Sequence, residues 1–294
     1  MRIRQALAVG LVTLAPALTG CLTHIRAVPK THPPEVVMSA TLDQLLSSVD
    51  TRLNQIQTIN ATVEIVASEG GARQGQIKQF PSFTGYIFLR KPESLRVLMR
   101  LPVLGSQALD MVSNGKAWKL WVPPKKLAMT GTSEVADPPQ HGLESLRPKV
   151  IFDSLLVRGL ATDQVVDMTQ DSRVIPDPKD KKQLIEEPDY ELTILEPPQG
   201  QTAHTLRVIH IGRSTLLPYQ QDIYDQNGYV VTQAFYSNYQ TFGDIQFPMK
   251  IDIKRPQDQY GLAITITKVS LNQKLEDDQF ELKFPEGIPV KTMN

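Results

Sequence analysis

One cysteine and five histidines are the side chains of this sequence with the most reactive or metal-binding chemistry. Cys21 is the only cysteine among 294 residues, so no intramolecular disulfide can form and a hydrophobic core must hold the fold. His204 and His210 are six residues apart, which places them on one face of a strand but too far apart to bind the same metal ion. The sequence therefore predicts no metal site. It favours solvated or hydrogen-bonded histidines at positions 24, 32, 141, 204 and 210.

Catalytic motifs are missing from the sequence. No serine lies in a Gly-x-Ser-x-Gly setting, and the glycines form no phosphate-binding loop. If Cys21 belongs to the N-terminus of the mature chain, the folded body also lacks a thiol nucleophile. We expect a protein that is not an enzyme, with an unrecognised catalytic site as the alternative.

The N-terminal segment has the composition of a secretory signal. Arg2 and Arg4 precede an apolar run, Ala6–Leu18, that is too short to span a bilayer as a helix. The run closes with Leu18-Thr19-Gly20-Cys21, which resembles a lipobox, in which the thiol receives a diacylglyceryl group before cleavage on its N-terminal side. Residues 1–20 are thus expected to be a lipoprotein signal peptide and Cys21 the lipid-bearing residue; the alternative is a core cysteine beside an ordinary cleavage site.

Charge and the residue after the cysteine give expectations about location and partners. Lys plus Arg and Asp plus Glu both number 31, which leaves no basic surplus for nucleic acid and no polybasic patch for anionic lipid. Leu22 follows the cysteine, where an aspartate favours retention in the inner membrane of diderm bacteria. By that resemblance we expect a lipid anchor on the periplasmic face of the outer membrane, with no cofactor other than the covalent lipid on Cys21.

The remaining chain is expected to comprise a polar, proline-bearing tether at residues 21–38 and one domain at residues 39–294. Apolar residues at helical spacing predict a helix at residues 39–58, and Thr41 with Gln44 resembles a capping box. A second short helix is expected at residues 149–160. Residues 123–148 are expected to form a loop and residues 169–188 an exposed insertion.

Between and after these segments the pattern changes to a period of two, typical of strands. Asn114-Gly115 and Asn227-Gly228 each favour a tight hairpin, so the sheet should be antiparallel. The expected fold is mainly β (α+β): a strongly curved antiparallel sheet, or incomplete β-barrel, with an N-terminal helix and a lid helix. Strands are expected at residues 83–90, 94–101, 107–112, 117–122, 190–195, 204–211, 218–224, 229–236, 245–254 and 262–271.

The concave face of such a sheet either packs with side chains or holds a hydrophobic ligand. The sequence leaves both open: an ordinary packed core, or a cavity under the lid helix. The residues expected to line a cavity are Phe88, Val97, Met99, Leu109, Met111, Trp118 and Leu120, with Phe235 and Ile251 as further inward-facing candidates.

Three stretches in the right order resemble the LolA/LolB family of periplasmic lipoprotein carriers. The first runs from Phe83-Thr84-Gly85-Tyr86 to Arg96 through a Lys91-Pro92 turn. The second is residues 239–248, and the third is residues 275–287, which resemble the closing segment of the family. The resemblance implies that family's fold over about residues 39–290, except in the long loops 123–148 and 169–188.

The lipid anchor places the resemblance with the LolB type, which is itself a lipoprotein and carries a protruding apolar loop of the form Pro-Leu-Gly-Ser. This sequence reads Leu101-Pro102-Val103-Leu104-Gly105-Ser106, with Val103 as an extra residue. Val103 and Leu104 are therefore expected to form a membrane-insertion loop. The alternative is a plain hairpin with a buried leucine.

The resemblance implies a receptor that binds acyl chains of lipoproteins or other lipids in a hydrophobic cavity and passes them to the outer membrane. Its expected partners are the membrane, the lipoprotein or lipid cargo, and a soluble periplasmic carrier. The alternative is a non-catalytic periplasmic sensor or scaffold lipoprotein of an envelope complex. The sequence does not identify the cargo, because acyl recognition needs apolar area more than particular residues.

Overall fold

The computed structural model describes residues 26–132, 146–197 and 200–293. The chain divides into two compact units, residues 1–33 with 174–186 and residues 34–173 with 187–294. Of the first unit, the described segments hold a short parallel pairing of Thr31 and His32 with Leu184 and Ile185. The expected signal segment, residues 1–20, and Cys21 lie outside the described residues.

The described chain is mostly β-structure, with two α-helices, α2 (Leu42–Gln55) and α3 (Pro148–Leu155), and two short 3-10 helices, Pro123–Lys125 and Asp277–Phe280. No helix in these residues is long and apolar enough to cross a bilayer. The strands are β1 (Thr31–His32), β2 (Thr58–Gly71), β3 (Gln76–Gln79), β4 (Phe83–Arg90), β5 (Ser94–Arg100), β6 (Gln107–Ser113), β7 (Ala117–Val122), β8 (Leu127–Thr132), β9 (Val165–Pro176), β10 (Leu184–Leu195), β11 (Thr205–Gly212), β12 (Leu217–Tyr224), β13 (Val230–Phe242), β14 (Ile245–Arg255), β15 (Tyr260–Leu271) and β16 (Val290–Met293).

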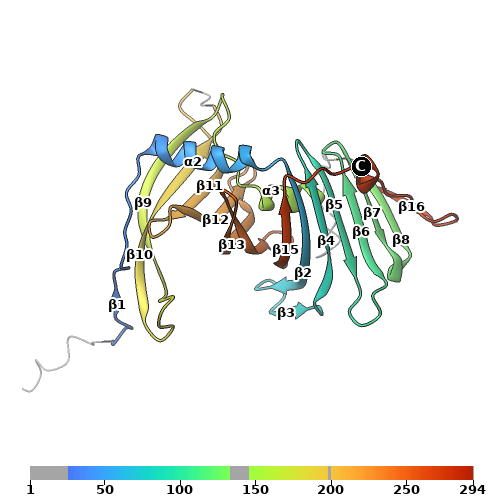
Figure 1. The fold of residues 1–294 in the computed structure, drawn as a ribbon, viewed down its shortest axis with the longest axis horizontal. Helices are drawn as coiled ribbons and strands as arrows, with labels where there is room; N and C mark the ends of the chain where they lie inside the picture. Colours follow the sequence, from blue (N-terminus) through green and yellow to red (C-terminus); the bar gives the residue numbers. More distant parts are fainter. Residues whose placement is uncertain (1–25, 133–145, 198–199, 294) are drawn as a thin grey trace, which may run out of the picture. The chain divides into compact units, whose positions relative to one another are not determined.

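The larger unit is built on one large, curved sheet (Figure 1). Its strand order is β10-β11-β12-β13-β14-β15-β2-β4-β5-β6-β7-β8-β16, with β9 on β10 and β3 on β2. Neighbouring strands are antiparallel from β10 to β8, and only β16 runs parallel to its neighbour, β8. In the described part of the chain the two ends of this order do not pair, so the sheet stays unclosed.

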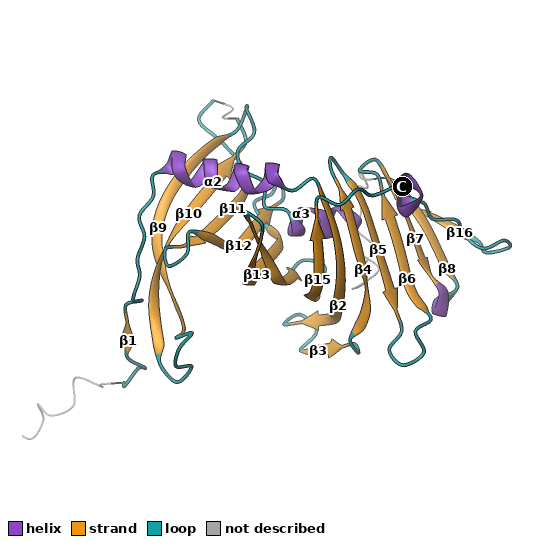
Figure 2. Cartoon of the chain, in the orientation of Figure 1, coloured by secondary structure: helices purple, strands orange, loops and turns teal. Residues whose placement is uncertain are grey.

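Each α-helix lies against part of this sheet (Figure 2) and buries apolar residues there. Leu45 and Val49 of α2 are buried with apolar residues of β10 and β11. Thr41 and Gln44 form the capping box at the start of α2: the Gln44 amide donates to the Thr41 hydroxyl, and the Thr41 amide donates to the Gln44 side chain. The helix is therefore fixed at its N-terminus by the residues that the sequence singled out.

Two segments expected to be loops contain strands. Residues 169–188, expected to be an exposed insertion, hold most of β9 and the start of β10. Most β9 side chains are exposed on both faces, so the strand lacks the alternation of polar and apolar residues that marks a half-buried strand. Within residues 123–148, Leu127–Thr132 form β8 and Pro148 begins α3, while residues 133–145 lie outside the described part.

Candidate functional site

The connection between β5 and β6 carries two exposed apolar side chains. Val103 is 104% exposed and Leu104 is 78% exposed. Backbone hydrogen bonds close the loop below them, from the Leu101 amide to the Ser106 carbonyl (2.8 Å) and from the Gly105 amide to the Leu101 carbonyl (3.1 Å). The alternative with Leu104 buried under the sheet does not fit this exposure.

The backbone holds this tip in a costly conformation. Val103 has a φ of 70°, and the Leu104 amide donates to the Pro102 carbonyl at 2.8 Å, which makes a γ-turn of the rare positive-φ form. A β-branched residue at positive φ is unusual, because its side chain crowds the backbone. Such strain is commonly found at functional sites.

Six of the residues predicted to line a cavity lie together on one face of β5, β6 and β7. The strand register places Met99 opposite Leu109, Val97 opposite Met111, and Met111 opposite Leu120. Trp118 lies two residues before Leu120, on the same face. All six belong to or pack against one large hydrophobic cluster, in which Met111 is fully buried. These side chains form a packed interior.

Phe88 differs from the prediction. Its neighbours Ile87 and Leu89 are fully buried in the cluster, so the alternation of β4 turns Phe88 to the opposite face. There it stacks on Tyr86, with ring centroids 6.1 Å apart. The sequence did not distinguish the two faces of β4, because apolar residues occupy Tyr86 through Leu89 without interruption.

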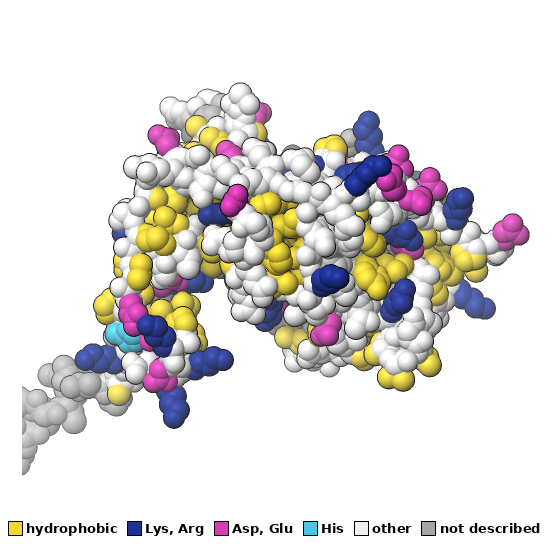
Figure 3. Space-filling model, viewed as in Figure 1, with side chains coloured by type: hydrophobic (Ala, Val, Ile, Leu, Met, Phe, Trp, Pro, Cys, Tyr) yellow, Lys and Arg dark blue, Asp and Glu magenta, His cyan; other side chains and the backbone are white. Residues whose placement is uncertain are grey.

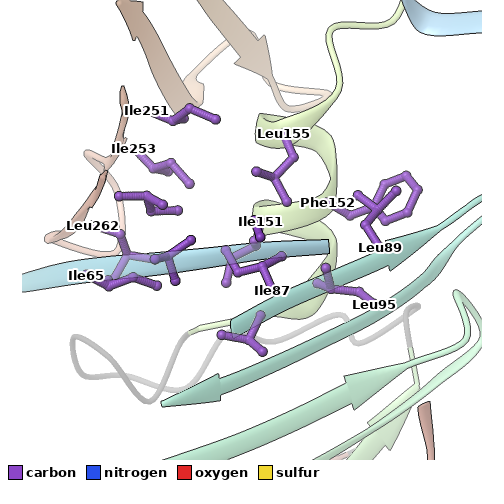
Figure 4. Packing of buried hydrophobic residues seen from close by; sticks show 14 of the residues in the cluster. Ile65, Ile87, Leu89, Leu95, Ile151, Phe152, Leu155, Ile251, Ile253 and Leu262 are labelled. Carbon is purple, nitrogen blue, oxygen red and sulfur yellow. The ribbon is translucent and has the colours of Figure 1, made fainter. Parts of the chain in front are cut away.

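Helix α3 covers this interior as the predicted lid helix would. Ile151, Phe152 and Leu155 are buried in the same cluster as Ile87 and Leu95 (Figure 4). A cavity of about 40 Å³, lined by residues including Leu155 and Tyr236, lies beside these contacts. Its volume suits a water molecule or two and not an acyl chain.

Two of the sequence motifs pack on each other. Arg90 donates to the Leu275 carbonyl (3.1 Å) and pairs with Asp277 (2.7 Å). Arg96 makes two hydrogen bonds to the Asp110 carboxylate (3.0 and 2.7 Å) and donates to the carbonyl of Gln279 (3.1 Å). The arginines of the first motif therefore fix the C-terminal segment, residues 275–287, against β4 and β5.

A second group of chemically capable residues lies on the polar face of β10, β11 and β12. Glu191 is paired with His210 in the strand register, and the His210 Nδ1 lies 3.1 Å from a Glu191 oxygen. The His210 Nε2 lies 3.4 Å from Asp222. Burial acts to lower the pKa of His210, but the hydrogen bond to Asp222 and the charges of Glu191, Asp222 and Asp189 outweigh it and raise the pKa above its ordinary value.

This group was not predicted from the sequence, where the spacing of His210 from His204 was the basis for excluding a shared metal ion. His204 is exposed and precedes β11. The available signal was the alternation of Asp189, Tyr190, Glu191 and Leu192, which puts two carboxylates on one face of a strand whose other face is apolar. Their proximity to His210 depends on the register between β10 and β11, which is a property of the folded sheet.

Acidic and basic side chains are interspersed on the face shown in Figure 3, with apolar side chains between them. No large patch of one charge sign is visible among the described residues of that face.

Comparisons with known proteins give the following similarities. A family model described as "Uncharacterized protein" matches residues 167–284. No curated protein matches the sequence. Among solved structures, the chain is similar to a LolA superfamily protein from Nitrosomonas europaea, at 13% identity over 83% of this chain and 99% of that one, with a TM-score of 0.49.

A second solved structure, described as an outer membrane lipoprotein-sorting protein domain from Vibrio parahaemolyticus, is 11% identical over 81% of this chain and 94% of that one, with a TM-score of 0.45.

Proposed function

We propose that this protein is a lipid-anchored receptor of the outer membrane that binds acyl chains of lipoproteins or other lipids and passes them to the bilayer. The observation that carries the proposal is the β5–β6 hairpin. Its tip presents Val103 and Leu104 to solvent, while its body supplies Val97 and Met111 to the apolar interior. One hairpin thus joins a surface suited to lipid with an interior suited to acyl chains.

Entry of an acyl chain requires displacement of α3. Uncovering Ile151, Phe152 and Leu155 costs about 1.5–3 kcal/mol for each side chain, and each acyl methylene removed from water contributes about 0.8 kcal/mol. About six to eleven buried methylenes therefore offset the loss of the three helix contacts. A helix of eight residues has little stability apart from its packing, so α3 can move away from the sheet as a lid.

The test is binding of a fluorescent long-chain fatty acid to the chain carrying Cys21→Ser, which keeps the body and removes the lipid. We expect saturable binding of the probe, and unlabelled fatty acid should displace it. Phe152→Ala should increase the affinity or the rate of uptake, because it widens the space under α3 while it lowers stability. Lys149→Ala is the control, because Lys149 is exposed on the same helix. This variant should leave both fatty-acid binding and stability unchanged.

The packed interior favours a second candidate function, that of a non-catalytic scaffold or sensor lipoprotein of an envelope complex. Ile87, Leu89 and Met111 are already fully buried without a ligand. In that case the wild-type chain binds no fatty acid, and Phe152→Ala lowers stability without creating a binding site. That result would reject the carrier function.

A further inference from the structure

We propose that Asp189, Glu191 and His210 form a binding site for one divalent transition-metal cation, such as Zn²⁺, on the polar face of the β10–β11 ladder. This site is independent of the acyl-binding function. Each of the three residues offers one ligand atom, and these atoms all lie within 4.8 Å of one another. A single ion can therefore reach all three with small side-chain adjustments.

Asp189 is the second observation that points to a ligand. It is 2% exposed, and its Oδ2 accepts a hydrogen bond from the Tyr219 hydroxyl. Its Oδ1 is buried and has no hydrogen-bond partner within the described residues. A buried carboxylate oxygen without a partner is costly, and a bound cation would remove that cost.

The charges around the group favour a cation. Four carboxylates come from β10 and β12: Glu187, Asp189, Glu191 and Asp222. In the described part of the chain, one guanidinium contacts these carboxylates, that of Arg173 on β9. It is paired with Glu187 at 2.6 Å and stacks on the Tyr219 ring. His210 contacts Glu191 and Asp222, and no ion pair joins Asp189 to a basic side chain within the described residues, so a divalent ion would balance the charge of Asp189 and Glu191.

The surroundings of His210 resemble the second layer of a metal site. Asp222 lies 3.4 Å from the Nε2 of His210 and is itself held by the amides of Gln220 and Gln233, at 2.9–3.1 Å. A carboxylate on Nε2 fixes the proton there and leaves Nδ1 free to bind a metal. Nδ1 is the nitrogen that faces Glu191.

The donor set selects the class of ion. Ca²⁺ and Mg²⁺ prefer oxygen ligands alone, whereas one imidazole with two carboxylates suits Zn²⁺ and related transition metals. Three protein ligands leave a fourth tetrahedral position for water. The side chain of Glu191 is 30% exposed, which provides a path for the ion from solvent to the buried Asp189.

The experiment is calorimetric titration of untagged, full-length chain carrying Cys21→Ser, so that the thiol cannot bind metal. We expect one Zn²⁺ per chain and no comparable binding of Mg²⁺. Asp189→Asn and His210→Gln should each abolish this binding, and Asp222→Asn should weaken it about 10- to 100-fold. His204→Gln, a change of an exposed histidine, should leave the affinity unchanged.

Nitrogen-15 NMR of the histidine rings tests the same site without altering its ligands. Zn²⁺ should shift the Nδ1 resonance of His210 and leave that of His204 in place. Absence of saturable binding, equal binding by Asp189→Asn, or Zn²⁺-dependent shifts confined to other histidines would each overturn the proposal.

Discussion

Replacement of Leu104 by glutamate separates a membrane-inserting tip from an ordinary hairpin. Leu104 is 78% exposed, so the change should alter the free energy of unfolding by no more than about 0.5 kcal/mol. Insertion of this side chain into lipid is worth about 1.5–3 kcal/mol. Its loss should therefore weaken liposome binding about 10- to 150-fold.

The assay is co-sedimentation with liposomes, using chain that carries Cys21→Ser so that no lipid on residue 21 masks the contribution of the loop. Ile77→Glu is the matched control. Ile77 is 71% exposed on β3, so this variant also replaces an exposed aliphatic side chain by glutamate, at a different surface position. We expect Leu104→Glu to lose liposome binding while Ile77→Glu keeps it. Equal loss in both variants, or a large fall in Tm for Leu104→Glu, would refute the reasoning.

Val103→Gly is a second variant of the same tip. Glycine accepts the φ of 70° at this position and removes about 1–3 kcal/mol of strain, which exceeds its entropic cost of about 0.5–1 kcal/mol. Stability should be unchanged or higher, while liposome binding falls because an apolar side chain is lost. A less stable variant would show that Val103 supports the fold.

Three further predictions address the anchor and the sheet. Cys21→Ser should release the protein from membranes in a fractionation with salt wash, because serine carries no acyl chain and the about 1.5–3 kcal/mol contributed by each tip side chain supports only weak, washable binding; a variant that stays membrane-bound after the wash would contradict the lipid anchor. Arg96→Met should lower the free energy of unfolding by about 3–5 kcal/mol in urea titrations, because it leaves the buried Asp110 carboxylate unpaired, and Asp110→Asn in the same chain should restore part of the loss. Gly85→Ala should lower Tm, because its new Cβ would lie 2.0 Å from the backbone oxygen of Leu98 and force β4 away from β5; an unchanged Tm would show that the strands can separate there at no cost.

Elements with local sequence patterns could be predicted before the fold was known. The capping box of Thr41 and Gln44 marks the start of α2, and the Asn114-Gly115 and Asn227-Gly228 turns lie where β6 meets β7 and β12 meets β13. Strands β4 and β7 have the predicted bounds. These features depend on residues close in sequence, because helix caps and hairpin turns are satisfied within a few residues.

The buried face of a strand and the contacts between residues distant in sequence depend on the folded sheet. Phe88 lies on the opposite face of β4 from the interior, since its buried neighbours set the alternation. The packing of α3 on Ile87 and Leu95 shows that the interior is filled. Asp189, Glu191 and His210 come together through the register of β10 and β11. Register depends on the burial of a whole strand face, and a one-residue shift would move every side chain to the other face, so no local motif records it.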